Sequence, residues 1–298
     1  MSAKGDRSSP TVFRSAEAER DILERYDRFV ADWPVPLDER DIETRWGSVH
    51  VLSWGAPDGP ALLLCHAASM AATSWLPNAA ALADAGFRCH AVDYIGEANK
   101  SRLTDRDVYP KSGQELGELC ADLMDALGIE RCPVVAASAG GHVALRLALA
   151  TPDRVEKLVL AGPMGITPLS LGSMMRMMVA SMVPRTSVVE RTSKWALGTS
   201  PSVSARFGGW FAAVLKALAS PPRVARPVAL EPDEFRRIQV PVLLLLGARD
   251  PLVGDARRAA DRASALPDLQ VETLESSHLV AVERADEVNT RMVEFLRR

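Results

Sequence analysis

The sequence has few residues of the kinds that bind metals or form cross-links. Its 298 residues include only four cysteines and five histidines. The cysteines lie in apolar segments without C-x-x-C or Cys–His spacing: Cys65, Cys89, Cys120 and Cys132. This usage predicts reduced, buried cysteines and argues against a disulfide framework or a metal site. Neither disulfides nor a metal is needed to stabilise the fold, because a chain of this length can bury about three quarters of its unfolded surface.

Targeting and membrane-spanning signals are also missing. The opening residues "MSAKGDRSSP" are polar and lack the apolar stretch of a signal peptide, so we expect a disordered tail over residues 1–14 and a cytoplasmic protein. Residues 159–183 come nearest to a membrane span, but Pro163, Pro168 and Arg176 interrupt them, and we expect no span. The net charge of −3 favours no particular partner, and we expect no nucleic-acid binding.

Strand-like and helix-like segments alternate through most of the chain. Residues 15–31 predict an amphipathic helix, and a strand pair follows around Gly47. Later strands are apolar on both sides and are separated by helical patterns: "ALLLCHA", "FRCHAVD", "CPVVAAS", "KLVLAG", "VPVLLLLG" and "LQVETLE". Such strands are typical of an α/β protein whose parallel sheet is covered by helices on both faces.

One of these helices has clear start and stop signals. Ser112 and Glu115 form a capping box, which satisfies free N–H groups at the first turn. Apolar side chains then repeat at helical spacing and predict one buried stripe: Leu116, Leu119, Cys120, Leu123, Met124 and Leu127. Gly128 supplies the left-handed residue that ends the helix.

A long segment with a different composition interrupts the alternation. Residues 164–236 hold six of the ten methionines, and residues 164–230 carry eight basic residues against one acidic residue, Glu190. An insertion of this size predicts a helical lid over 164–236, with 15–163 and 237–298 forming the core. We interpret the methionines as core packing in preference to a substrate surface, although methionine suits both roles.

Ser138 lies where a predicted strand turns into a helix. The stretch Ala136-Ala137-Ser138-Ala139-Gly140 matches the strand–turn–helix motif G-x-S-x-G, with alanine at the first small position. Small residues are needed there because the backbone and the helix pass closely. The turn exposes the serine hydroxyl beyond the carboxyl end of the sheet, where reactive groups of parallel sheets gather.

A serine hydroxyl becomes a good nucleophile when a base takes its proton and an acid orients that base. Asp250 ends the apolar strand "VLLLLGARD", and His278 follows the last strand in "LESSHLVAVE". Both therefore fall at the same sheet edge as Ser138, in the order Ser, Asp, His. Asp255 is the better candidate for a helix cap, and we interpret His142 as a packed residue.

Acyl transfer also needs two N–H donors for the oxyanion. The backbone N–H of Ala139, directly after the nucleophile, is one candidate. The loop after "LLLCHA" supplies the other, and we assign it to Ala68.

Further segments carry a resemblance to a known family: "DWPV", "SWLPNAAAL", "AVDYIGEANKS" and "PVLLLLG". From about Tyr26 to its end, the chain resembles the α/β-hydrolase superfamily, and within it the bacterial carboxylesterase NP (naproxen esterase) type. The resemblance implies an eight-stranded, mostly parallel sheet with a helical lid, and ester hydrolysis without a cofactor.

The same resemblance implies roles for individual residues. Ser138 would be the nucleophile, Asp250 the acid and His278 the base, with Ala68 and Ala139 lining the oxyanion hole. The sequence departs from the family at two positions. Ala67 replaces the glycine of the family's His-Gly pair, and Ala136 replaces the first glycine of the serine motif. A positive φ at Ala67 would cost about 1 kcal/mol.

These features predict a serine hydrolase that cleaves small-molecule esters with an apolar acyl or alcohol group through an acyl-enzyme. Two alternatives remain open. The basic lid could receive an anionic acyl carrier, which would make the protein a thioesterase or acyltransferase acting on CoA or carrier-protein acyl groups. The architecture also hosts non-hydrolytic cyclases, lyases and ligand-binding proteins.

Overall fold

A mostly parallel sheet forms the centre of the computed structural model. The main sheet has eight strands: β1 (Leu37–Thr44), β2 (Gly47–Gly55), β3 (Ala61–Cys65), β4 (Arg88–Val92), β6 (Cys132–Ala137), β7 (Val155–Ala161), β8 (Val242–Gly247) and β9 (Leu269–Leu274). Their order across the sheet is β1-β2-β4-β3-β6-β7-β8-β9, and only β2 runs antiparallel to its neighbours. A two-residue strand, β5 (Arg102–Leu103), also pairs with β2. The predicted eight-stranded, mostly parallel sheet is confirmed.

The structure describes most of the chain, in these ranges: 12–105, 107–183, 185–198, 200–203, 207–219 and 225–298. The predicted tail over 1–14 falls largely outside them. Its last residues are described and are packed: Phe13 is buried and bridges to Leu218, while Arg14 N–H donates to Ala217 O at 2.9 Å. Within the described residues, every helix is too short or too polar to cross a lipid bilayer.

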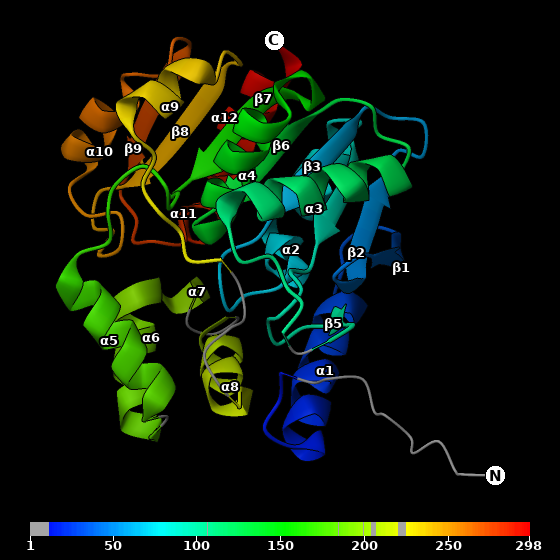
Figure 1. Ribbon diagram of the computed structural model, residues 1–298, viewed down its shortest axis with the longest axis vertical. Coiled ribbons are helices and arrows are strands. Elements are labelled where there is room, and N and C mark those ends of the chain that lie inside the picture. Colours follow the sequence, from blue (N-terminus) through cyan, green and yellow to red (C-terminus); the bar gives the residue numbers. More distant parts are fainter. Residues whose placement is uncertain (1–11, 106, 184, 199, 204–206, 220–224) are drawn as a thin grey trace.

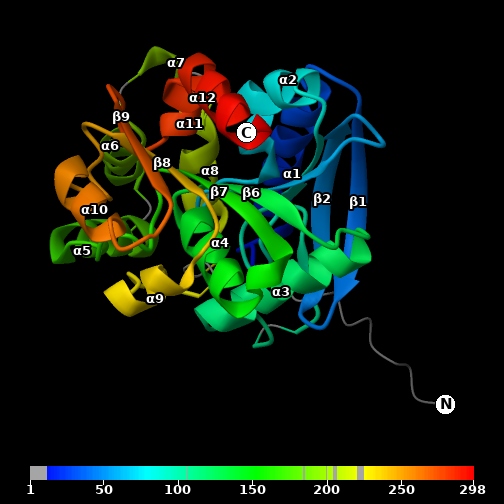
Figure 2. The ribbon, with the colours of Figure 1, turned by 90° about the horizontal axis from the view of Figure 1, so that it is seen from above.

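Helices cover both faces of the sheet (Figures 1 and 2). One face carries α3 (Gly113–Ala126), α4 (Ala139–Ala150), α9 (Pro232–Arg237) and α10 (Ala256–Ala263). The other carries α2 (Leu76–Asp84), α11 (Val280–Glu283) and α12 (Ala285–Arg297). Strand β3 shows why both faces are apolar: Leu62 and Leu64 belong to one core cluster, and Leu63 and Cys65 belong to the other.

The helix signals that the sequence predicted are present. Ser112 Oγ accepts from Glu115 N, and the Glu115 side chain accepts from the Ser112 backbone, so the capping box of α3 is confirmed. Gly128 has a φ of +71° after the end of α3. Asp255 caps α10 by accepting from Arg258 N, as predicted.

The segment between β7 and β8 is helical. It contains α5 (Leu171–Met182), α6 (Thr186–Leu197), α7 (Pro201–Val203) and α8 (Gly209–Ala217). Figure 1 places these helices, with α1 (Ala16–Ala31), at one end of the sheet. They reach the carboxyl-end loops, since a Cβ built on Gly198 would lie 2.7 Å from Ser277 Cβ. The last helix of the segment, α9, differs because its Phe235 is buried in the core cluster that it shares with β8.

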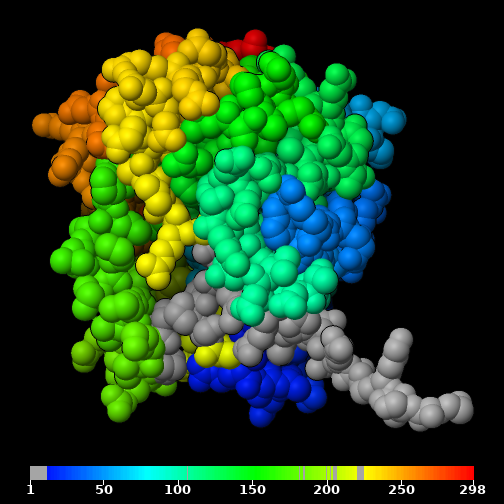
Figure 3. Space-filling view, viewed as in Figure 1, coloured from blue at the N-terminus to red at the C-terminus, as the bar shows by residue number. Residues whose placement is uncertain are grey.

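The interpretation of the methionines as core residues is wrong for most of them. Met174, Met175, Met178 and Met182 on α5 are 47–70% exposed. Helix α5 lies at the outer edge of the molecule, in light green in Figure 3. Ala180 and the partly buried Met177 pack against the core cluster, but no layer among the described residues covers the four exposed methionines.

Candidate active site

Ser138 sits on a sharp turn between β6 and α4. Its backbone has φ 51° and ψ −117°, and the only other non-glycine residue with positive φ in the described part of the chain is Ser69. Three backbone hydrogen bonds hold the turn: Ser138 N–H donates to Ala161 O, and Ser138 O accepts from Gly141 N and Met164 N. A strained residue needs such fixing, and this turn resembles the strand-to-helix elbow of the G-x-S-x-G motif.

The small residues around Ser138 are required by close backbone approaches. A Cβ on Gly140 would lie 2.2 Å from Cys65 O, and one on Gly141 would lie 2.4 Å from Pro163 Cβ. Ala136, which stands at the first glycine position of the motif, is fully buried in β6. The elbow therefore forms with alanine at that position.

The structure brings the three predicted side chains into one hydrogen-bonded chain. His278 Nε2 lies 2.6 Å from Ser138 Oγ, and His278 Nδ1 lies 2.8 Å from Asp250 Oδ2. All three residues are no more than 4% exposed. Gly162, with φ +54°, makes room for them: a Cβ there would lie 2.7 Å from His278 O. This arrangement can move the proton of the Ser138 hydroxyl to the imidazole.

Asp250 is itself fixed by the backbone that follows it. Its Oδ1 accepts from Leu252 N at 2.8 Å and from Val253 N at 3.0 Å, which leaves Oδ2 for the imidazole. The carboxylate is thereby held in one orientation.

The two predicted oxyanion donors lie after the carboxyl ends of two neighbouring parallel strands, β3 and β6. Ala139 is the first residue of α4, and Ala68 follows the end of β3; both are half-buried. Neither backbone N–H donates to an acceptor within the described residues. The strain anticipated for Ala67 does not arise, because positive φ falls two residues later, at Ser69. Free N–H groups at these positions could bind an oxyanion.

A buried polar cluster, which the sequence analysis did not single out, lies behind the Ala68 loop. Ser69 N–H donates to Glu97 Oε2 at 2.9 Å, and Ala72 N–H donates to Asp93 Oδ1 at 2.7 Å. Burial raises the pKa of the Glu97 carboxyl to about 8. Burial lowers the pKa of the nearby His66 imidazole, because burial disfavours the charged form of either group. In the sequence analysis, the segment "AVDYIGEANKS" was used only for the family resemblance. Its acidic residues Asp93 and Glu97, which stand among apolar residues, could have indicated this cluster.

The remaining polar candidates are consistent with structural roles. His142 is buried, and burial, with Arg146 nearby, lowers its pKa to about 4. The four cysteines are free and buried, as predicted. No group of three or more potential metal ligands occurs among the described residues.

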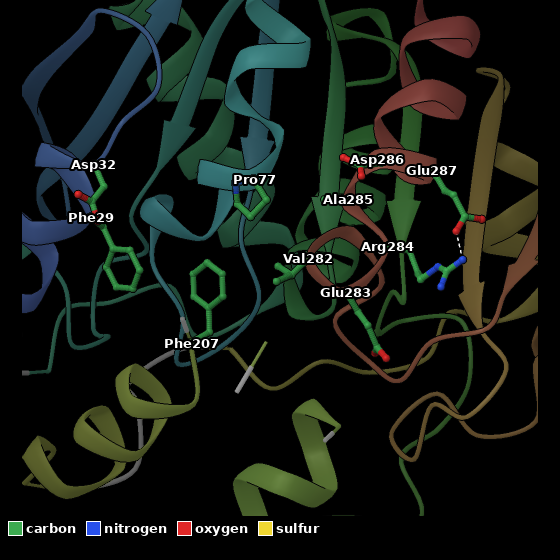
Figure 4. Close-up of a pocket in the computed structure, with 10 residues that line it drawn as sticks. All are labelled: Phe29, Asp32, Pro77, Phe207, Val282, Glu283, Arg284, Ala285, Asp286 and Glu287. Atoms are coloured by element: carbon green, nitrogen blue, oxygen red, sulfur yellow. Dashed lines mark ion pairs between the residues drawn. The ribbon is translucent and has the colours of Figure 1, made fainter. Parts of the chain in front are cut away.

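Two hollows are lined in part by residues of α11. A cleft of about 920 Å³ is lined by Phe29, Phe207 and an acidic rim that includes Asp286 (Figure 4). A much smaller apolar cavity, of about 10 Å³, is lined by Ala137, next to Ser138. Val282 lines both, so it separates the cleft from the cavity beside the serine.

Comparisons of the sequence and the structure with known proteins agree with this architecture. Residues 62–291 match the model of the alpha/beta hydrolase family. The chain belongs to this family. The match includes Ser138, Asp250 and His278.

Individual relatives extend the likeness over nearly the whole chain. Carboxylesterase YbfK of Bacillus subtilis (strain 168) is 28% identical over 291 residues, covering 95% of this chain and 96% of the relative. The crystal structure of naproxen esterase (carboxylesterase NP) from Bacillus subtilis superposes with a TM-score of 0.86 at 26% identity, covering 95% of this chain and 99% of the other. The structure of carboxylesterase CesB (YbfK), from the same organism, has a TM-score of 0.85 at 27% identity, covering 94% and 99%. The resemblance stated from the sequence is confirmed.

Proposed function

We propose that this α/β hydrolase is a carboxylesterase that cleaves small esters with an apolar acyl or alcohol group through an acyl-enzyme. The observation that carries the proposal is the hydrogen-bonded chain from Ser138 Oγ through His278 to Asp250. The relatives named as carboxylesterases support the ester as the substrate class. The apolar side chains that line the small cavity beside Ala137 support an apolar group next to the scissile bond.

In the proposed mechanism, His278 Nε2 takes the hydroxyl proton while Ser138 Oγ bonds to the ester carbonyl carbon. Asp250 keeps the second imidazole proton on Nδ1 and stabilises the imidazolium. The N–H groups of Ala68 and Ala139 stabilise the oxyanion, each by about 3 to 4 kcal/mol. The imidazolium then gives its proton to the leaving alcohol as the C–O bond breaks. A water molecule, deprotonated by His278, attacks the acyl-enzyme, and release of the acid returns the proton to Ser138.

The helices α5–α8 serve as the lid in this proposal. Leu197 and Val203 from α6 and α7 pack in the same core cluster as Leu279, the residue after His278. Because Ser138 is only 3% exposed, a substrate reaches it when this layer moves or through the cleft at Val282.

The test combines labelling with turnover. A fluorophosphonate probe is incubated with the full chain, the adduct is located by peptide mass spectrometry, and p-nitrophenyl esters of increasing acyl length are assayed. We expect one adduct, on Ser138, and hydrolysis of the esters. An adduct on another residue would overturn the nucleophile assignment. Labelling of Ser138 without turnover of any ester would overturn ester hydrolysis and favour the non-hydrolytic alternative.

Val282 is expected to influence the acyl length that the site accepts. Val282→Trp places an indole between the small cavity and the larger cleft, so it blocks a longer acyl group that would extend from Ser138 into the cleft. We expect kcat/KM for an octanoate ester to fall about tenfold relative to the acetate ester, in the range that hydrophobic pockets discriminate. The matched control, Val108→Trp, changes an exposed valine that lines neither hollow. An unchanged octanoate-to-acetate ratio in Val282→Trp would exclude the passage at Val282 as the acyl site.

A further inference from the structure

The backbone of Ser69 is strained beside a proposed oxyanion donor. Ser69 has φ +59° and follows Ala68 directly. A serine in the left-handed region is unfavourable, so the surrounding contacts must hold it there. The Ala68 N–H lies in the peptide unit just before the one that Ala68 and Ser69 share, so the proposed donor is one residue away from the fixed Ser69 backbone.

Two side chains from distant segments hold the peptide groups of Ser69. Glu97 Oε2, from the loop after β4, accepts from Ser69 N at 2.9 Å. Trp210 Nε1, from α8, donates to Ser69 O at 3.2 Å. Trp210 is in turn packed edge-on against Tyr26 and Phe29 of α1. The N–H and the C=O of one strained residue are therefore both fixed by side chains.

A buried glutamate at position 97 destabilises the fold unless its hydrogen bond to Ser69 N–H compensates. It is 2% exposed and lies near a second buried carboxyl, Asp93. Burial of a carboxyl disfavours its charged form, and a neighbouring like charge adds to the penalty. An apolar side chain would avoid both penalties but would leave the buried Ser69 N–H without an acceptor.

We propose that Glu97 is a positioning residue: by holding Ser69, it fixes the loop that carries the Ala68 N–H. We propose also that Trp210 connects helix α8 of the lid to Ser69. The inference rests on the proposed ester hydrolysis for its kinetic consequence. The Ala68 N–H donor acts only in the transition state, when the carbonyl oxygen becomes an oxyanion. Loss of its alignment therefore lowers kcat with little effect on KM.

The kinetic test compares two substitutions of similar size. Glu97→Leu removes the acceptor, and we expect kcat to fall about 30-fold or more with KM changed less than about threefold, since removing a whole oxyanion donor costs about 100-fold or more. Glu97→Gln keeps an acceptor oxygen, and we expect kcat within about threefold of the unsubstituted protein. If Gln is as damaging as Leu, or Leu is harmless, the positioning role is wrong.

The hydrogen bond from Trp210 to Ser69 is tested by a second pair of substitutions. Trp210→Phe removes the indole N–H while keeping an aromatic ring against Tyr26, and we expect a kcat loss of about threefold to tenfold, as for one neutral hydrogen bond. Trp33→Phe makes the same chemical change at an indole whose Nε1 has no partner among the described residues, and we expect no loss. Equal effects of the two substitutions would overturn the role of Trp210.

A measurement without catalysis separates this inference from the proposed function. In the Ser138→Ala background, amide hydrogen exchange is followed in the peptide that spans residues 66–73. We expect Glu97→Leu to increase exchange at the Ser69 amide and Glu97→Gln to leave it slow. Unchanged exchange in Glu97→Leu would overturn the inference. Failure of the unsubstituted protein to hydrolyse any ester would overturn the proposed function instead.

Discussion

Asp250→Asn is expected to lower kcat for ester hydrolysis about 10⁴-fold while the fold is retained, the size of loss that follows when the imidazole takes the wrong tautomer. The reason lies in how the carboxylate is bound. Asp250 Oδ1 accepts from the backbone N–H groups of Leu252 and Val253, and Oδ2 faces His278 Nδ1. Both oxygens act as acceptors, and an asparagine can supply only one.

The two backbone donors decide which way the asparagine turns. Its carbonyl oxygen satisfies Leu252 N and Val253 N, so its NH₂ group points at His278 Nδ1. That nitrogen must then act as an acceptor, and the ring proton moves to Nε2. With a proton on Nε2, the imidazole donates to Ser138 Oγ and is unable to take the hydroxyl proton.

The measurement is kcat on a short p-nitrophenyl ester, with the thermal unfolding midpoint recorded in parallel. Asp255→Asn is the matched control, because it makes the same chemical change at the cap of α10, where asparagine caps as well as aspartate. We expect the control to keep wild-type kcat. A variant Asp250→Asn with more than about one tenth of the wild-type kcat would contradict the role of Asp250 in setting the tautomer.

The sheet and the Ser138–His278–Asp250 geometry could be foreseen because both depend on local patterns. Apolar segments alternating with helices predict parallel strands, and parallel strands bring their carboxyl ends to one edge. Ser138 follows such a strand directly, and Asp250 and His278 lie within four residues of the ends of β8 and β9, so their proximity needed no knowledge of the packing. The capping residues Ser112 and Asp255 were equally accessible, since a cap contacts backbone only three residues away.

What the sequence did not reveal depends on long-range packing. Glu97 and Trp210 meet at Ser69 from segments 28 and 141 residues away, and no local pattern marks that meeting point. The methionines of α5 have helical spacing, but spacing alone does not say whether a second layer covers them. The exposed fraction of 47–70% shows that, in the described chain, none does. Phe13 was assigned to a polar tail, because its partner Leu218 is too far away in the sequence for a local pattern to indicate the contact.

Gly140→Ala is expected to lower the free energy of unfolding by about 2 to 3 kcal/mol, the upper range for overpacking a well-filled interior. The added methyl would stand 2.2 Å from Cys65 O and 2.8 Å from His66 O. These atoms are backbone at the end of β3, which pairs with β6, so no flexible side chain can move aside.

The same substitution is expected to reduce kcat, because the clash forces β3 away from the start of α4. That separation moves Ala68 relative to Ala139, the two proposed oxyanion donors. Urea unfolding measures the stability change, and p-nitrophenyl ester turnover measures kcat. Gly209→Ala is the matched control: it lies at the start of α8, its Cβ would meet no atom of the described residues within 4 Å, and alanine favours the helix by up to about 1 kcal/mol. If Gly140→Ala is as stable and active as the control, the elbow has more room than its backbone contacts indicate, and the close approach of β3 to α4 does not position the two donors.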